Sequence, residues 1–153
     1  MENRVVITGL GAVTPIGNNL EIFWSNLING KNGIANISQF DTNDFNVKIA
    51  AEVSIDLNTF FSTKELNKID RFTAFSIIAA DEAIKNSQLN QKTDKNKIGV
   101  IIGSGIGGIN TFEKQHKRLL QHPKKVSPYF IPTMISDIAA GHISIRHGYK
   151  GSN

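Results

Sequence analysis

Cysteine is absent from this sequence of 153 residues. Its absence excludes disulfide bonds, thiolate metal sites and a sulfur nucleophile within these residues. Long apolar runs are also lacking, since none reaches the roughly 18–20 residues of a membrane-spanning helix. Residues 1–9 do not show the order of charged, apolar and small residues that marks a secretory signal. We therefore expect a cytoplasmic globular protein that does not act at a membrane.

Positive charge exceeds negative charge by four, and the surplus is concentrated in one segment. Residues 113–125 contain five lysine or arginine residues and one glutamate. Of the 17 basic and 13 acidic residues in the chain, 12 of each lie elsewhere and cancel. A single positive segment predicts one acidic partner, although a solvated helix face would give the same pattern. No aromatic residues alternate with these lysines, which disfavours nucleic acid as the partner.

Short apolar runs predict strands at two places in the chain. Residues 4–9 and 98–103 are apolar runs that end in glycine, as is typical of strands buried on both faces. Residues 47–53 give a weaker strand signal, and residues 31–46 are rich in polar turn formers and predict a surface loop.

Helical periodicity predicts several helices between these strands. Residues 70–87 are apolar nearly all round, which predicts a buried helix. Residues 111–121 predict a basic helix, and residues 133–147 predict a last helix that ends at Gly148. Three prolines predict an extended segment over residues 122–132.

Two helix starts carry capping signals. Asn18 precedes an apolar helical pattern, and Ser62 and Glu65 have the spacing of a capping box. Strands that alternate with long apolar helices indicate an α/β layered architecture.

Glycine-rich segments follow both predicted strands, but neither completes a nucleotide-binding motif. Gly9 and Gly11 begin a dinucleotide fingerprint in which Thr14 replaces the third glycine. Residues 103–108 have the glycine spacing of a phosphate loop without the lysine and hydroxyl residues that must follow. We interpret these glycines as turn formers. The histidines and acidic residues show no acid–base or metal-ligand pattern, so no metal is expected.

Five segments stand in a recognisable order along the chain. They are RVVITGLGAVTPIG from Arg4, a W-x-x-L-x-x-G-x-x-G-I pattern from Trp24, IGVIIGSGIGG from Ile98, SPYFIP from Ser127 and AAGHISIRHGYKG from Ala139. In this order they resemble the opening of the β-ketoacyl-[acyl-carrier-protein] synthases, nearest to the synthase II type. That family has a thiolase-like fold with layers in the order αβαβα, built from two similar halves, and it works as homodimers. The resemblance implies that residues 1–153 are an incomplete N-terminal β-ketoacyl synthase domain, with only part of the N-terminal half of the fold.

The resemblance also implies acyl transfer in fatty-acid biosynthesis. Members of the family take an acyl chain from acyl carrier protein onto a cysteine and condense it with malonyl-ACP, which two histidines help to decarboxylate. In the family this cysteine follows shortly after the segment that matches residues 148–151. We therefore expect no catalytic residue in this chain and no activity from the chain alone. No cofactor is expected besides the phosphopantetheine that acyl carrier protein carries.

Some substrate and partner residues can be carried over by their matching positions. Ile106 matches the isoleucine at the throat of the acyl pocket, and Phe130 and Ile135 match apolar residues that line it, Phe130 from across the dimer interface. Four lysines match basic residues that meet the acidic helix of acyl carrier protein: Lys64, Lys68, Lys124 and Lys125. Asn67 stands where the family often has arginine, which weakens this patch by one charge. Exposed ion pairs contribute only ~0.2–1 kcal/mol each, so the patch should mainly orient the partner.

Three hypotheses follow for the function. The first is a piece of an elongating 3-oxoacyl-ACP synthase, whose parent protein is an acyltransferase. The second is a non-catalytic module that binds acyl carrier protein or a complementing chain through its basic face. The third is a nucleotide-dependent reductase, which the residues at the glycine-rich turn disfavour.

Overall fold

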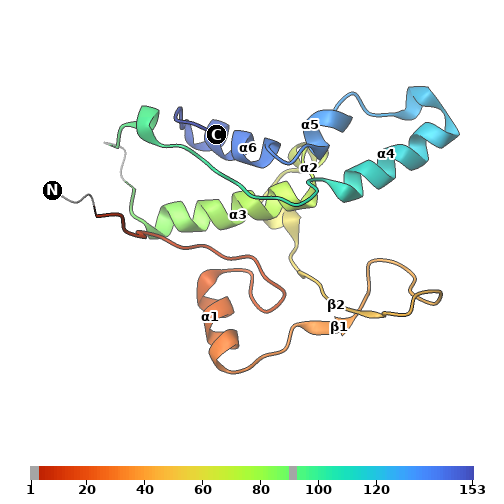
Figure 1. Ribbon diagram of the computed structural model, residues 1–153, viewed down its shortest axis with the longest axis horizontal. Helices are drawn as coiled ribbons and strands as arrows, with labels where there is room; N and C mark the ends of the chain where they lie inside the picture. The colour runs from red at the N-terminus through yellow and green to blue at the C-terminus, as the bar shows by residue number, and fades with distance from the viewer. Residues whose placement is uncertain (1–3, 90–92) are drawn as a thin grey trace.

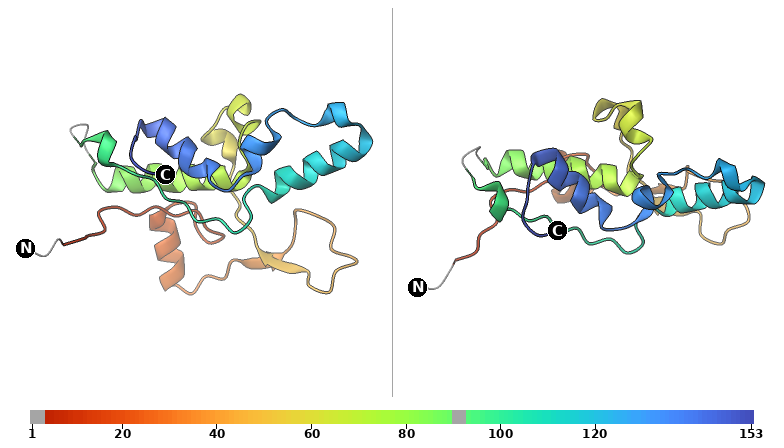
Figure 2. Two further views of the ribbon diagram at one scale, coloured as in Figure 1. Left: turned by 45° about the horizontal axis from the view of Figure 1, so that its top comes forward. Right: turned by 90° about the horizontal axis from the view of Figure 1, so that it is seen from above.

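The computed structural model describes residues 4–89 and 93–153, and Figures 1 and 2 show their arrangement. Helices predominate, and one short two-stranded sheet accompanies them. In chain order the elements are α1 (Leu20–Ile28), β1 (Ile34–Asn36), β2 (Ile49–Ala51), the 3-10 turn η1 (Leu57–Thr59), α2 (Thr63–Leu66), α3 (Arg71–Asn86), η2 (Lys95–Lys97), α4 (Ile109–Gln121), η3 (Pro123–Lys125), α5 (Phe130–Met134) and α6 (Ile138–His147).

The core lies where α3 packs against α6 (Figure 1). Small residues let the two helices approach closely, since Ala74 of α3 and Ala139 of α6 have no exposed surface. Larger side chains fill the space beside them, and Ile143 is only 2% exposed. The predicted buried helix over residues 70–87 is thereby confirmed, with Asp70 as its N-cap.

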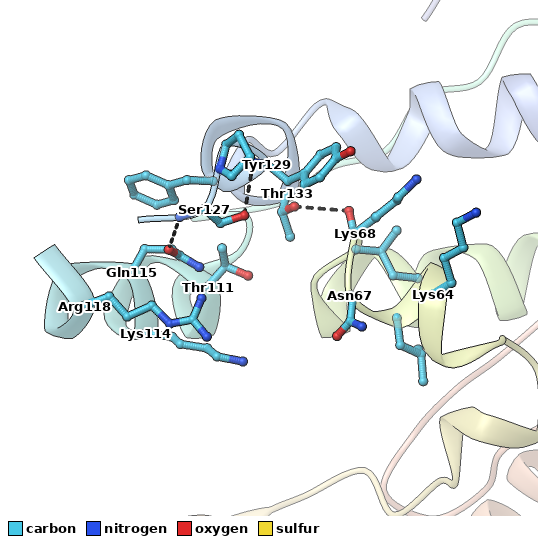
Figure 3. Close-up of a pocket in the computed structure, with 14 residues that line it drawn as sticks. Lys64, Asn67, Lys68, Thr111, Lys114, Gln115, Arg118, Ser127, Tyr129 and Thr133 are labelled. Atoms are coloured by element: carbon cyan, nitrogen blue, oxygen red, sulfur yellow. Dashed lines mark hydrogen bonds between the residues drawn. The ribbon is translucent and has the colours of Figure 1, made fainter. Parts of the chain in front are cut away.

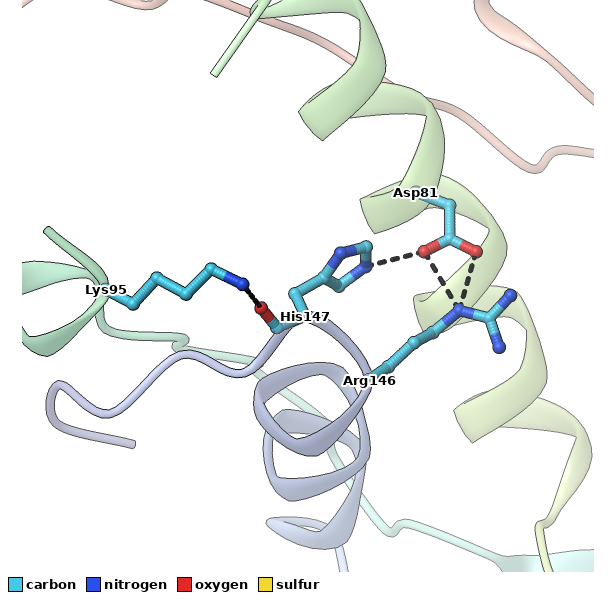
Figure 4. Close-up of polar contacts among 4 residues, drawn as sticks. All are labelled: Asp81, Lys95, Arg146 and His147. Carbon is cyan, nitrogen blue, oxygen red and sulfur yellow. Dashed lines mark hydrogen bonds and ion pairs between the residues drawn. The ribbon is translucent and has the colours of Figure 1, made fainter. Parts of the chain in front are cut away.

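Polar contacts fasten the same two helices at their far end (Figure 4). Asp81 of α3 accepts from Nε of Arg146 at 3.0 Å and lies 2.7 Å from Nε2 of His147. The ammonium group of Lys95 donates to the backbone carbonyl of His147 at 2.8 Å. Gly148 then ends α6 in the left-handed conformation, as predicted.

The buried strand predicted over residues 4–9 is not formed. Val5 is 93% exposed and Ile7 is 83% exposed, because no strand in the described part of the chain pairs with this segment. The glycine-rich segment after it instead lies directly on α3. A Cβ at Gly9 would lie 2.2 Å from the carbonyl oxygen of Ala83, so the backbone approach itself requires glycine.

The strand predicted over residues 98–103 is also not formed. This segment is extended, and it exchanges two backbone hydrogen bonds with residues 151–152, from Val100 to Ser152 and from Gly151 to Ile98. Ile101 is nevertheless 90% exposed. Val100 and Ile102 pack against the core, so one side of the segment is covered. A strand buried on both faces also needs neighbouring strands and a second covering layer, which the described residues do not provide.

The sheet that does form lies in the N-terminal part of the chain. β2 falls within the predicted residues 47–53 and pairs antiparallel with β1, with Ala35 opposite Ala50. β1 lies in the segment predicted to be a surface loop, so that prediction missed a strand. The cap of α1 is Asn19 rather than the predicted Asn18, and its side chain accepts from the backbone of Ile22.

The last predicted helix, over residues 133–147, is divided into α5 and α6. Ile135 has an extended backbone and separates the two. α5 contains Pro132, so the prediction that residues 122–132 are entirely extended is wrong. Proline is tolerated in the first turn of a helix, where the backbone N–H groups lack intrahelical partners anyway.

Much apolar surface stays uncovered. The chain exposes 11241 Å², whereas a compact monomer of its mass exposes roughly 7,700 Å². No helix within residues 4–89 and 93–153 has the length and hydropathy to cross a bilayer.

Candidate functional site

A groove of about 500 Å³ lies between α4 and the corner that joins α2 to α3, with α5 closing one side (Figure 3). Four cations line it. Lys64 and Lys68 come from the α2 corner, and Lys114 and Arg118 come from α4. We call this hollow the basic groove.

A buried carboxylate fixes α4 against α3. Asp70 is 6% exposed, and its Oδ2 accepts from the backbone N–H and the hydroxyl of Thr111 at 2.9 and 2.6 Å. Its Oδ1 accepts from the backbone of Phe72 at 3.4 Å. One side chain therefore satisfies donors at the starts of both helices, which fixes how α4 leaves the core.

Two further hydrogen bonds fix the remaining wall. The Thr133 hydroxyl of α5 donates to the backbone carbonyl of Lys68 at 3.1 Å. The side chain of Gln115, 6% exposed, accepts from the backbone of Ser127 at 2.8 Å. These bonds tie α5 to the turn after α2, and α4 to the loop before α5, so the groove is built before any partner arrives.

The charges in the basic groove are all of one sign. None of its lining residues is acidic. In the part of the chain that the structure describes, none of the four groove cations has a carboxylate within ion-pair distance. Two acids adjoin groove lysines in sequence. Glu113 pairs with Lys117, and Glu65 folds back on its own helix and accepts from the backbone and hydroxyl of Ser62 at 2.8 and 2.6 Å. These bonds form the predicted capping box and lower the pKa of Glu65.

The four predicted docking lysines fall into two groups. Lys64 and Lys68 share the basic groove, where Lys68 also lies over the ring of Tyr129 at 5.5 Å. Lys124 and Lys125 lie in η3 at the far end of α4 and do not line the groove. Nζ of Lys125 donates to the side chain of Gln121 at 3.0 Å.

The three predicted acyl-pocket residues lie around α5, with Phe130 at its start and Ile135 just after its end. Phe130 lines the basic groove and contacts Phe112 of α4, with ring centroids 6.3 Å apart. Ile135 is half-buried at the break after α5. Ile106 is 73% exposed in the loop before α4. The backbone of Gly107, next to Ile106, lies against Met134, so the loop reaches the same end of α5.

The described residues contain no candidate cluster of metal ligands. No group of three or more metal-ligating side chains occurs in residues 4–89 and 93–153. Two acidic residues for which the sequence indicated no partner form ion pairs or hydrogen bonds in the structure. Asp81 pairs with α6, and Glu82 accepts from the backbones of Ala12 and Leu20 at 2.9 and 2.8 Å.

Sequence reasoning did not single out Lys114 and Arg118 as site residues. Both belong to the basic segment, and the signal that would have selected them is their spacing. Residues four apart lie on one helix face, whereas Lys117 faces elsewhere and pairs with Glu113.

Residues 2–153 match the family model described as Beta-ketoacyl synthase, N-terminal domain. The 3-oxoacyl-[acyl-carrier-protein] synthase 2 of Staphylococcus aureus (strain COL) is 46% identical over 153 residues, which covers 98% of this chain and 37% of that protein. The protein of the same name from Synechocystis sp. (strain ATCC 27184 / PCC 6803 / Kazusa) is 42% identical, covering 99% of this chain and 37% of that protein. The chain thus spans little more than a third of the length of these relatives.

Solved structures share the fold. A chain of the complex "AntDE:AntF (apo): type II PKS acyl-carrier protein in complex with its ketosynthase bound to the hexaketide" superposes with a TM-score of 0.77 at 27% identity, over 100% of this chain and 42% of that one. "The ishigamide ketosynthase/chain length factor" superposes with a TM-score of 0.84 at 21% identity, over 96% of this chain and 38% of that one. These neighbours confirm the predicted thiolase-like α/β fold class. The fold covers the whole described length of the chain, and the family model matches residues 2–153. The chain therefore belongs to the β-ketoacyl synthase family.

Proposed function

We propose that residues 1–153 are the N-terminal part of a 3-oxoacyl-ACP synthase that elongates acyl chains by decarboxylative condensation with malonyl-ACP. The observation that carries this proposal is the 46% identity to a synthase 2 over 98% of the chain. The uncovered apolar surface supports the further proposal that these residues are an incomplete domain. In that view, additional polypeptide covers residues 4–9 and 98–103 in the complete gene product, meaning the whole polypeptide encoded by the reading frame that contains residues 1–153.

The proposed role of these residues is to bind acyl carrier protein and to shape the acyl pocket. The basic groove supports carrier binding, because it presents four cations without an acidic lining residue. A solved neighbour is a ketosynthase in complex with its acyl-carrier protein, which supports the same class of partner. Ile106, Phe130 and Ile135 are proposed to line the acyl pocket of a cytoplasmic homodimer. Phosphopantetheine would enter on the carrier protein.

The chemistry itself needs a nucleophile from outside these residues. Transfer of an acyl group from a carrier thioester onto an enzyme cysteine requires a thiolate. These 153 residues contain no cysteine, so we propose that the chain alone is inactive.

The test compares the complete gene product with the 153-residue chain. Each is incubated with radiolabelled acyl carrier protein thioester and malonyl-ACP, and covalent loading and chain extension are measured. The complete gene product should load and extend the acyl group, and the shorter chain should do neither. Loading and extension by the purified 153-residue chain would refute the proposal of an incomplete enzyme.

A second candidate function is a non-catalytic module that binds acyl carrier protein. It is favoured by one observation: the four groove cations lie within these residues, whereas no cysteine does. Sequencing the reading frame past codon 153 separates the two candidates. A frame that continues into a strand followed by a cysteine favours the synthase, and a stop codon there favours the module.

A further inference from the structure

Helix α4 adds two cations to the basic groove, on the wall opposite the α2 corner. Lys114 is exposed and Arg118 is half-buried, and both line the groove. Figure 3 shows them extending from α4 into the hollow, with Lys64 and Lys68 on the opposite wall and their ammonium groups directed away from α4. Lys114 and Arg118 lie about one helical turn apart on α4, whereas Lys64 lies in α2 and Lys68 in the turn after it, so each wall carries a pair of cations.

Four like charges around one hollow repel each other and create a focused positive potential. An anionic occupant relieves this repulsion, and the groove holds no carboxylate of its own. The two walls are fastened through Asp70 and Thr133, so a partner need not pay to order them.

The geometry favours an acidic protein face over a small anion. A small anion needs donors that converge on one point, yet the hydroxyls of Thr111 and Thr133 are already donated to Asp70 and to the carbonyl of Lys68. Long, separated side chains on two walls instead match carboxylates spread along a helix. Arg118 adds a planar guanidinium that can bind one carboxylate through two hydrogen bonds.

We propose that Lys114 and Arg118 bind carboxylates of the same acidic carrier protein that Lys64 and Lys68 contact, so that the carrier lies across the groove between α2 and α4. This inference rests on the proposed function. It adds α4 as a second wall of the docking site.

The test measures carrier binding by the complete gene product through fluorescence anisotropy of a labelled acyl carrier protein. The Lys114→Glu/Arg118→Glu variant should weaken binding about tenfold or more, because two attractions become repulsions. The neutral variant Lys114→Ala/Arg118→Ala should weaken it less. Circular dichroism of each variant checks that α4 remains folded.

Lys117→Glu/Lys97→Glu is the charge-matched control. Lys117 adjoins Arg118 but does not line the groove, and Lys97 is exposed in η2. This control should leave binding within about twofold of the unmodified protein. The loss in the groove variant should shrink at about 500 mM salt, where screening shortens the range of these attractions.

The possible results distinguish the role of α4 from the identity of the partner. If Lys64→Glu/Lys68→Glu weakens binding and Lys114→Glu/Arg118→Glu behaves like the control, the α4 wall is refuted while carrier docking stands. If the unmodified protein does not bind the carrier, the proposed partner fails as well. Displacement of the carrier by millimolar inorganic phosphate, at constant ionic strength, would identify a small-anion site and overturn the proposal.

Discussion

The α3–α6 pair and the extended segments at residues 4–9 and 98–103 are both rich in apolar side chains. They differ in how far those side chains are buried. Ile143 of α6 is 2% exposed, whereas Ile101 is 90% exposed. Both lie in apolar stretches that read as core from the sequence. The difference is that α6 has α3 to pack against, whereas residues 98–103 pack on the core with one side only, through Val100 and Ile102, and leave Ile101 uncovered.

Whether an apolar side chain is buried thus depends on the element that packs against it and not on the residue type alone. Two helices can satisfy their own backbones and need a partner on only one stripe. A strand needs neighbours for its backbone and for both faces. Helices of a layered α/β protein therefore keep their form with few neighbours, and its strands do not.

The largest expected effect tests whether this contrast persists in the complete gene product. Ile143→Ala should destabilise it by about 2–5 kcal/mol, because a filled core site becomes a cavity. If further polypeptide covers residue 101, Ile101→Ala should cost a similar amount. Urea unfolding with tryptophan fluorescence and circular dichroism measures both.

The same pair of variants can also break the proposal of an incomplete domain. If Ile101→Ala shifts the free energy of unfolding by less than about 0.5 kcal/mol, residue 101 is surface in the complete protein too. The extended segments would then be exposed by nature, and the proposed additional layer would be wrong.

A smaller effect is expected where the core meets the basic groove. Asp70→Asn should destabilise the protein by about 1–3 kcal/mol, because the partly buried Thr111 donors lose a charged acceptor. Carrier binding should weaken as well if α4 shifts. Asp44→Asn, at an exposed position, is the matched control and should change neither.

The helices were predictable from the sequence, and the strands were predictable only as apolar runs. The periodicity of α3, the capping box at Ser62 and the stop at Gly148 are local signals, and local backbone bonding satisfies them. Residues 4–9 and 98–103 carry an equally clear apolar signal, but their pairing depends on residues elsewhere. The division of the last helix at Ile135 was missed because a regular apolar spacing runs through the break.

The candidate site was only partly predictable from the sequence. The family resemblance supplied Lys64 and Lys68, and the charge count supplied the basic segment that contains Lys114 and Arg118. Neither shows that the two sets line opposite walls of one groove. That arrangement depends on Asp70 and Thr111, which are 41 residues apart and whose side chains have no unusual sequence pattern.

The smallest expected effect concerns pH. Burial lowers the pKa of His142 below its usual value of 6.5, so the folded protein binds this proton more weakly than the unfolded chain does. The stability contributed by neutral His142 is present above pH 6.5 and is lost as the pH falls toward the folded pKa.

His142→Gln should therefore flatten the decline in unfolding free energy on acidification below pH 6.5. Urea unfolding over a series of pH values measures the slope. His116→Gln, at an exposed position on α4, is the control and should keep the slope of the unmodified protein. An unchanged slope in the His142 variant would show that its burial does not contribute to acid sensitivity.

The contact of Gly9 and Gly11 with α3 has a consequence for the side chains nearby. A Cβ at Gly11 would lie 2.0 Å from the carbonyl oxygen of Ala79, so main chain rests on main chain there. The segment is held without using Val5 or Ile7, whose side chains remain available to another surface. A neighbouring element can therefore pack on those side chains while the backbone of the segment keeps its contacts with α3.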